Sequence, residues 1–258
     1  MNQLLLGKNI IIMGVANKRS IAYSISQSLY NSGAKLIFTY QNKKLESDLI
    51  ALTEDMKDSL LFECDITKDE DIKVLFNNIK EKVGVIHGVV HCIAHAKVEE
   101  LQGRYVNTSR DGYLMAQNIS VYSLVAVARE AEPLMTEGGS IITLTYLGGE
   151  RVVKNYNVMG VAKAALDSSV QYLANDLGPN NIRVNAISAG PIRTLSAKGI
   201  KDFNYILRDI EEKAPLRRAT ETSEVGDTAL FLISNLSRGI TGEVIHVDSG
   251  YHILGAML

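Results

Sequence analysis

The chain contains no tryptophan, only four prolines and only two cysteines among its 258 residues. Cys64 and Cys92 lie far apart in the sequence, without a C-x-x-C motif and without histidines at metal-ligand spacing. This pattern argues against a disulfide framework and against a metal site, and it favours a reducing compartment. The low proline content and a hydrophobic fraction of 46% are typical of an ordinary globular protein rather than a disordered one.

A long hydrophobic run and an excess of basic residues are also missing. The apolar stretch in MNQLLLGKNIIIMG is too short and too interrupted for a membrane span, and it lacks the basic region and cleavage site of a signal peptide. The formal net charge of −2 argues against nucleic acid or a membrane surface as a partner. The sequence therefore predicts a cytoplasmic protein that binds neither nucleic acid nor membrane.

Short apolar runs alternate with longer helical patterns, an order typical of βαβ units and a parallel sheet. The runs are rich in Ile, Val and Leu, as expected for strands that helices cover on both faces. The seven predicted strands are Asn9–Met13, Lys35–Tyr40, Leu60–Asp65, Ile86–Ala94, Ser140–Tyr146, Ile182–Ser188 and Glu243–Asp248. Without a linker, repeat or composition shift, residues 1–258 are predicted to form a single-domain α/β fold, a Rossmann-like doubly wound parallel sheet flanked by helices.

The turn after the first strand, GVANKRSIA, has features of a dinucleotide-binding turn. Gly14 permits a tight turn, and Ser20 stands where the N-cap of the next helix, ending near Asn31, is expected. The free amides of that helix are suited to bind a pyrophosphate. The full G-x-G-x-x-G motif is absent, however, so a plain strand-to-helix turn is an equal alternative on this stretch alone.

Polar and aromatic residues follow several predicted strands, at the edge of the sheet where open α/β folds bind ligands. Asp65 can accept a hydrogen bond from an adenine amino group, or it can cap the next helix. The second strand is followed by Gln41, Lys43 and Lys44 rather than by the Asp or Glu that usually binds the ribose of NAD. Gln41 cannot neutralise a 2′-phosphate, so the sequence favours NADH, with NADPH as the alternative.

Tyr156 and Lys163 stand seven positions apart in NYNVMGVAKAAL. Seven residues turn a helix through about 700°, only about 20° short of two turns, and advance roughly 10 Å along its axis. The two side chains should therefore face the same way. A catalytic pair beside a nicotinamide and two polar residues on an exposed helix face both fit this spacing.

Several stretches together resemble one known family. They are MGVANKRSIA, TLTYLGGE, YNVMGVAKAAL, IRVNAISAGPIRTLSAKGI and GEVIHVDSGYH. The sequence is similar to the short-chain dehydrogenase/reductase superfamily, and within it to the bacterial type I enoyl-acyl-carrier-protein reductases, which have Tyr-x6-Lys instead of Tyr-x3-Lys. The resemblance runs from about Leu6 to Ile253. It implies a homotetrameric oxidoreductase that reduces the trans-2 double bond of enoyl-acyl carrier protein with NADH or NADPH, in the last step of fatty acid elongation.

The resemblance also implies roles for individual residues. The catalytic residues would be Tyr146, Tyr156 and Lys163, and the substrate-binding residues Ala96, Tyr146 and Tyr156. The cofactor-binding residues would be Gly14, Ser20, Ile21, Gln41, Asp65, Ile66, Ile93, Lys163, Ile192, Arg193, Thr194, Leu195 and Ser196. Residues 194–205 would form a mobile substrate-binding loop.

One residue departs from the family pattern. After Ile93 and Ala94 the family usually has a Phe, whereas this chain has His95. A backbone contact would survive that change, but apolar packing beside the thioester would not. A catalytic His95 is the sharper alternative to a tolerated substitution, because histidine titrates near neutral pH.

The resemblance implies that Tyr156 donates a hydrogen bond to the thioester oxygen of an enolate, while Lys163 binds the nicotinamide ribose and supplies positive charge. Three basic residues on or after the predicted loop, Lys198, Lys201 and Arg208, would meet the acidic carrier protein, or they would form a solvated helix face.

Three other functions fit parts of the sequence. A carbonyl reductase or alcohol dehydrogenase of the same superfamily would need Lys at position 160, which is Gly160. A non-catalytic dinucleotide sensor would bind the cofactor without turnover, although Tyr156 and Lys163 are both present. A methyltransferase would need a Gly-rich loop for S-adenosylmethionine, which the sequence lacks.

Overall fold

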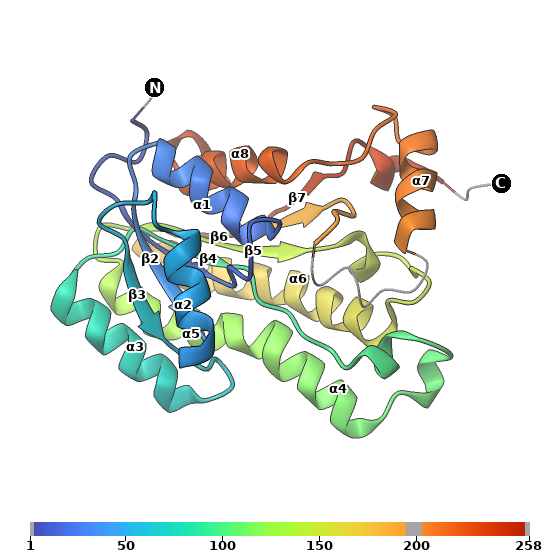
Figure 1. Cartoon of the computed structure of the whole chain (residues 1–258), viewed down its shortest axis with the longest axis horizontal. Helices are drawn as coiled ribbons and strands as arrows, with labels where there is room; N and C mark the ends of the chain where they lie inside the picture. The colour runs from blue at the N-terminus through green and yellow to red at the C-terminus, as the bar shows by residue number, and fades with distance from the viewer. Residues whose placement is uncertain (1–2, 195–202, 256–258) are drawn as a thin grey trace.

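The computed structural model describes residues 3–194 and 203–255. These residues form a seven-stranded parallel sheet with the order β3-β2-β1-β4-β5-β6-β7. The strands are β1 Asn9–Met13, β2 Lys35–Tyr40, β3 Leu60–Glu63, β4 Gly88–His91, β5 Gly139–Thr145, β6 Ile182–Ala189 and β7 Val244–Val247. Helices lie on both faces of the sheet (Figure 1), which confirms the predicted doubly wound fold.

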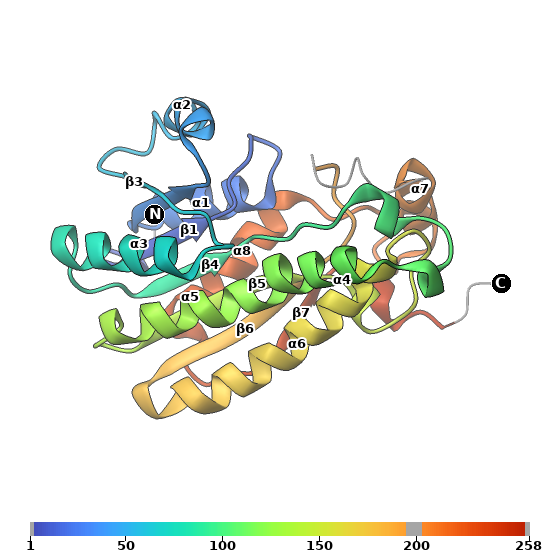
Figure 2. The ribbon, with the colours of Figure 1, turned by 90° about the horizontal axis from the view of Figure 1, so that it is seen from below.

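Two groups of helices cover the two faces. On one face lie α1 (Ile21–Asn31), α2 (Lys43–Leu52) and α8 (Thr222–Ile233). On the other lie α3 (Asp69–Lys82), α4 (Arg110–Gln117), α5 (Ser123–Ala131) and α6 (Asn157–Leu177), side by side in Figure 2. Because alternate strand side chains point to opposite faces, β1 sends Ile10 and Ile12 into the first core and Ile11 and Met13 into the second.

Most predicted strand boundaries agree with the structure to within one residue, but two strands end two or more residues earlier than predicted. β4 pairs with β1 and β5 only over Gly88–His91, instead of the predicted Ile86–Ala94. β3 ends at Glu63 instead of Asp65. The apolar residues after β4 leave the ladder because they border an opening at the carboxyl end of the sheet.

The chain reverses its direction of winding between β1 and β4, so their carboxyl ends bound the crevice where ligands bind in such sheets. Gly14 follows β1 with φ +92°, and a Cβ atom there would overlap the carbonyl oxygen of Cys92. Glycine is therefore required for β1 and the segment after β4 to approach this closely. Ser20 is the N-cap of α1, as predicted, and its Oγ accepts a hydrogen bond from the Tyr23 amide at 3.3 Å.

A π-helical segment, Asn118–Tyr122, joins α4 to α5, so the two helices run on as one rod in Figure 2. Its buried Ser120 accepts a hydrogen bond from the His95 amide at 3.0 Å and returns one to the His95 carbonyl at 3.3 Å. Such π segments occur often at functional sites. Here the segment fixes the backbone of the stretch that follows β4.

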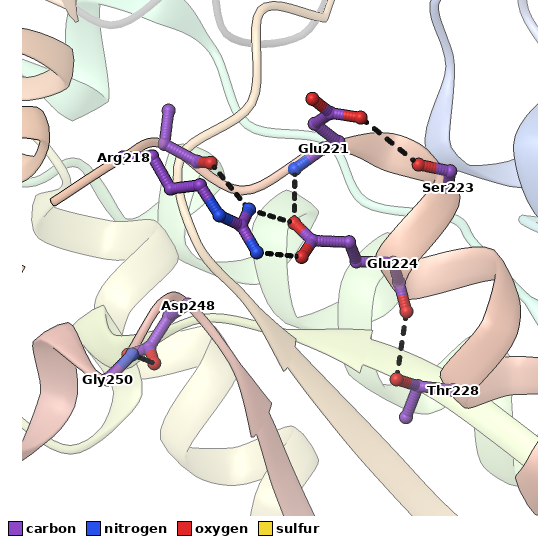
Figure 3. Close-up of polar contacts among 8 residues, drawn as sticks. Arg218, Glu221, Ser223, Glu224, Thr228, Asp248 and Gly250 are labelled. Atoms are coloured by element: carbon purple, nitrogen blue, oxygen red, sulfur yellow. Dashed lines mark hydrogen bonds and ion pairs between the residues drawn. The ribbon is translucent and has the colours of Figure 1, made fainter. Parts of the chain in front are cut away.

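Polar contacts hold the start of α8 and the turn that follows β7 (Figure 3). The Glu224 carboxylate accepts hydrogen bonds from Arg218 Nη1 at 2.8 Å and from the Glu221 amide at 2.9 Å, in a capping box. Asp248 follows β7 and accepts a hydrogen bond from the Gly250 amide at 3.0 Å. The first two contacts fix the chain between α7 (Phe203–Lys213) and α8, and the third fixes the turn after β7.

Candidate active site

A cavity of about 470 Å³ opens at the carboxyl ends of β1, β4, β5 and β6. Its lining comes from the turn after β1, the start of α1, the segment after β4, the end of β5, α6 and the segment after β6. The polar side chains that reach it are few, and most of the lining is aliphatic or aromatic, which is typical of small-molecule sites. The lining residues discussed below are Gly14, Ser20, Ile21, Cys92, Ile93, His95, Ala96, Thr145, Tyr146, Tyr156, Met159, Lys163, Ile192, Thr194 and Phe203.

The structure brings most of the predicted site residues together. The ones that line the cavity are Gly14, Ser20, Ile21, Ile93, Ala96, Tyr146, Tyr156, Lys163, Ile192 and Thr194. The ones that the structure places elsewhere are Gln41, Asp65, Ile66 and Arg193. Leu195 and Ser196 lie outside the described residues, as do Lys198, Lys201 and most of the predicted loop at 194–205.

Gln41 and Asp65 form a second group, beyond the ends of β2 and β3. Asp65 Oδ1 accepts hydrogen bonds from the Thr67 amide at 3.1 Å and hydroxyl at 2.8 Å. The N-cap residue of α3 is Lys68, so the alternative that Asp65 caps the next helix is wrong. Partial burial opposes ionisation of Asp65, but the Thr67 hydrogen bonds, Lys68 and Gln41 together lower its pKa. The carboxylate is therefore an ionised acceptor, which is what an adenine amino group or a ribose hydroxyl requires.

Tyr156 is the residue before the first residue of α6, so it is the N-cap residue of that helix rather than a member of it. Its backbone angles are close to helical (φ −116°, ψ −24°), which keeps the predicted common face with Lys163. Its ring packs edge-on against Tyr146, with 4.9 Å between the ring centroids and 71° between their planes. Burial, then Tyr146 and Asp167, raise the pKa of Tyr156, so its hydroxyl stays protonated and able to donate.

Lys163 is buried on α6, and its Nζ donates a hydrogen bond to the Leu144 carbonyl at 2.7 Å. Burial lowers the pKa of Lys163 to about 8, against the opposing effects of Asp167 and Cys92. An exposed lysine on an ordinary helix face has neither this burial nor this shift. The structure thus places Lys163 and Tyr156 in one cavity, each with a proton to donate at neutral pH.

Comparison with known proteins identifies the family. A family model described as Enoyl-(Acyl carrier protein) reductase matches residues 14–252, a span that includes the whole lining of the cavity. The chain belongs to the enoyl-acyl-carrier-protein reductase family. It is thus an oxidoreductase enzyme, as the sequence resemblance predicted.

Individual relatives agree with this assignment. The chain is 66% identical to the NADH-dependent enoyl-acyl-carrier-protein reductase FabI of Bacillus cereus, over 98% of this chain and 100% of that protein. It is 56% identical to the NADPH-dependent FabI of Staphylococcus aureus, over 96% of this chain and 97% of that protein. A crystal structure of the Bacillus cereus reductase with NADP+ and an indole naphthyridinone superimposes with a TM-score of 0.97, at 66% identity, covering 99% of this chain and 100% of that one.

His95, the departure from the family pattern, lines the cavity of this reductase with an exposed side chain. Its backbone amide and carbonyl are both held by Ser120, independently of which side chain stands at position 95. A contact made by the backbone of residue 95 therefore does not depend on whether Phe or His stands there.

Several residues at the reductase site carry no recognisable signal in the sequence motifs. Met159, Phe203 and Thr145 line the cavity. Asp167 lies one helical turn beyond Lys163 and influences both Lys163 and Tyr156. The four-residue spacing from Lys163 was the one available signal for Asp167, because residues at i and i+4 share a helix face.

The described residues offer neither a metal-ligand cluster nor a membrane-spanning helix. Among residues 3–194 and 203–255, no group of three or more His, Cys, Asp or Glu side chains is arranged to hold a metal ion. No helix in the same part of the chain is long and apolar enough to cross a membrane.

Proposed function

We propose that this protein reduces the trans-2 double bond of an enoyl-acyl-carrier-protein thioester, with hydride from NADH or NADPH, and that Tyr156 and Lys163 are its catalytic residues. The single observation that carries the proposal is the placement of the Tyr156 hydroxyl and the buried Lys163 ammonium in one largely apolar cavity. That cavity lies where the sheet reverses its winding, the usual place for a dinucleotide.

The residues present fit a dinucleotide. Gly14 has no Cβ, and one would fill the space against Cys92, so the turn after β1 keeps its backbone close to the cavity. Ser20 caps α1, whose first amides are free to bind a phosphate. Lys163 would hold the nicotinamide ribose, and Asp65 with Gln41 would meet the adenosine end. A bound reduced nicotinamide supplies the hydride.

The chain's own groups then stabilise the charge that develops on the substrate. When the β-carbon is reduced, negative charge builds on the thioester oxygen as an enolate. The Tyr156 hydroxyl donates a hydrogen bond to that oxygen, and the Lys163 ammonium adds a favourable positive potential in a site of low polarity. Tyr146 packs against the Tyr156 ring and limits its rotation.

The carbonyl reductase alternative, with Tyr-x3-Lys, has no support at position 160. A Cβ atom on Gly160 would lie 2.7 Å from the Gly148 carbonyl oxygen, too close for any side chain without a backbone shift. A lysine at that position would therefore disturb the segment that packs against Tyr156. The spacing seen here suits an enoyl thioester, whose oxygen is two atoms further from the hydride-accepting carbon than that of a ketone.

A reductase assay tests the proposed function. Purified protein with a trans-2-enoyl thioester is expected to consume NADH, followed by loss of absorbance, with a higher kcat/KM than with NADPH, because Gln41 offers no charge to a 2′-phosphate. NADH and NADPH are compared in parallel at equal ionic strength. Binding of either cofactor without turnover would contradict the proposal and favour the sensor alternative.

The acidic carrier protein is proposed to dock beside α7. Arg208 lies exposed on that helix, close in sequence to the end of the predicted loop. Replacing Arg208 by Glu is expected to raise KM for the carrier-bound substrate about threefold to tenfold, because one favourable surface contact becomes repulsive. KM for the matching CoA thioester should not change, and an equal rise for both substrates would contradict docking at Arg208.

Three further features are proposed for the same enzyme. A homotetramer is supported by the family and by apolar side chains exposed on the outer helices, among them Val74 on α3 and Leu114 on α4. A cytoplasmic location is supported by Cys64 and Cys92, which are free thiols. Residues 194–205 are proposed to close over the acyl chain, and residues 1–258 to act as one domain.

A further inference from the structure

Asp167 is a carboxylate in an unusual position beneath the proposed catalytic pair. It lies on α6 one turn after Lys163, and its Oδ1 atom is buried without a hydrogen-bond partner. The hydroxyl of Thr145, at the end of β5, is a second buried group without a partner at hydrogen-bonding geometry, although it lies near enough to Asp167 to stabilise the ionised carboxylate. Buried, unpaired carboxylates are costly and uncommon in folded proteins.

Space beside Asp167 is kept open by glycine. A Cβ atom on Gly149 would lie 2.9 Å from Asp167 Oδ2 and 2.9 Å from the Ala164 amide nitrogen, so the segment after β5 rests directly on this turn of α6. The carboxylate is therefore packed into its position between β5 and α6, and it is not a side chain free to turn away into solvent.

The charged groups around Asp167 come from three elements. Lys163 shares its helix, Glu150 follows the segment after β5, and His246 belongs to β7. His246 and Glu150 are already paired with each other, with 2.7 Å between Nε2 and Oε1. Burial raises the pKa of Asp167 to about 6, while Thr145, Lys163 and His246 oppose that rise.

Lys163 in turn has no carboxylate within ion-pair distance in the described part of the chain. Its ammonium faces the Leu144 carbonyl from β5, the Cys92 thiol from the segment after β4, and His91, which burial keeps neutral by lowering its pKa to about 3. Of the charges that favour the ammonium form, Asp167 has the largest effect. The same carboxylate also raises the pKa of Tyr156.

We propose that Asp167 is a positioning residue whose negative charge, held one turn of α6 beyond Lys163, keeps the proton on Lys163 during turnover. The inference rests on the proposed catalytic role of that pair. It adds a residue that touches neither substrate nor cofactor and acts through Lys163. A structural role alone would need no charge at this position.

The sign of the effect follows from the pKa values of Lys163 and Asp167. Lys163 is charged below about pH 8, and Asp167 is ionised above about pH 6, so both are charged between those limits. Without the carboxylate, burial of Lys163 is opposed less, and its pKa falls further. The alkaline limb of activity, where Lys163 loses its proton, should then move to lower pH.

The test compares Asp167→Asn with Asp176→Asn, an exposed carboxylate on the same helix. The Asp167 variant is expected to lose about tenfold in kcat/KM near pH 9 and less than twofold near pH 6, because an opposite charge at this range shifts a pKa by about one unit or more. The dissociation constant of the Asp167 variant for NADH, measured by fluorescence over the same pH range, should rise over the same pH values at which its kcat/KM falls. The Asp176 variant should follow wild type throughout.

Each outcome of the test has a defined meaning. A loss in the Asp167 variant that is equal at all pH values would overturn the proposal in favour of a packing role. Lys163→Met serves as the reference for the pair itself. If the Lys163 variant retains activity, the proposed catalytic role of Lys163 is wrong. If the Lys163 variant is inactive but the alkaline limb of the Asp167 variant falls at the same pH as that of wild type, only the role of Asp167 is wrong. Asp167→Ser removes the same charge with a smaller side chain and replaces the Asn variant if that protein does not fold.

Discussion

Replacing Tyr156 by Phe is expected to lower kcat about 10²–10³-fold, the usual loss when one preorganised donor to an oxyanion is removed. The ring should stay in place, because Tyr146 packs against its edge and Gly148 leaves room for it. The variant therefore loses the hydroxyl without losing the shape of the cavity. KM for the enoyl thioester should change much less than kcat, because the hydrogen bond strengthens as charge develops.

The measurement is steady-state kinetics of the Tyr156→Phe variant together with its NADH dissociation constant, which should equal that of wild type. Tyr172→Phe is the matched control, because Tyr172 lies on the same helix with 74% of its surface exposed. A Tyr156 variant with kcat within threefold of wild type would remove the hydroxyl from the mechanism. His95, which also lines the cavity, would then be the next residue to replace.

Replacing Gly14 by Ala is expected to reduce the free energy of unfolding by about 3 kcal/mol or more and to abolish tight NADH binding. The added Cβ would overlap the Cys92 carbonyl oxygen, and the residue would keep a φ of +92° that side chains rarely adopt. Overpacking in a dense region costs about 1–3 kcal/mol, and the left-handed backbone adds about 1–2 kcal/mol. Relief of the clash would push the turn after β1 away from the segment after β4.

Gly84→Ala separates the two contributions to that loss. Gly84 has a similar φ of +80°, but nothing lies within 4 Å of the Cβ position. Its replacement should cost only the backbone strain, about 1–2 kcal/mol, and leave NADH binding unchanged. Chemical denaturation and cofactor fluorescence of both variants check the prediction. Equal destabilisation by the two replacements would mean that contact with Cys92 does not hold the turn.

The strands and the site could be predicted from the sequence to different degrees. Strands such as Lys35–Tyr40 were predictable because a buried parallel strand needs an uninterrupted apolar run, which is visible locally. The end of β4 was not, since its pairing with β1 and β5 stops at His91 although the apolar run continues, and the residues after it line the cavity instead. The predicted strand Ile86–Ala94 was accordingly too long at both ends.

The properties of the site residues also depend on parts of the chain that are distant in the sequence. The resemblance located Tyr156 and Lys163, but the low pKa of Lys163 is caused by burial, which depends on how segments far apart in the sequence pack together. Thr145 and Gly149 contact the Asp167 region only because β5 and α6 are packed together. Contacts between distant segments, such as Ser120 with His95, likewise need the fold before they can be recognised.

The alternation of core residues along β1 makes the length of this strand more critical than its composition. Exchanging one aliphatic residue for another at Ile10, Ile11 or Ile12 alters one layer of packing and leaves the other intact. Deleting a single residue there would exchange the two layers, because every side chain beyond the deletion would point to the opposite face. It would also draw Gly14 about 3.3 Å out of register with Cys92. The length of β1 thus sets where the proposed nucleotide-binding turn begins.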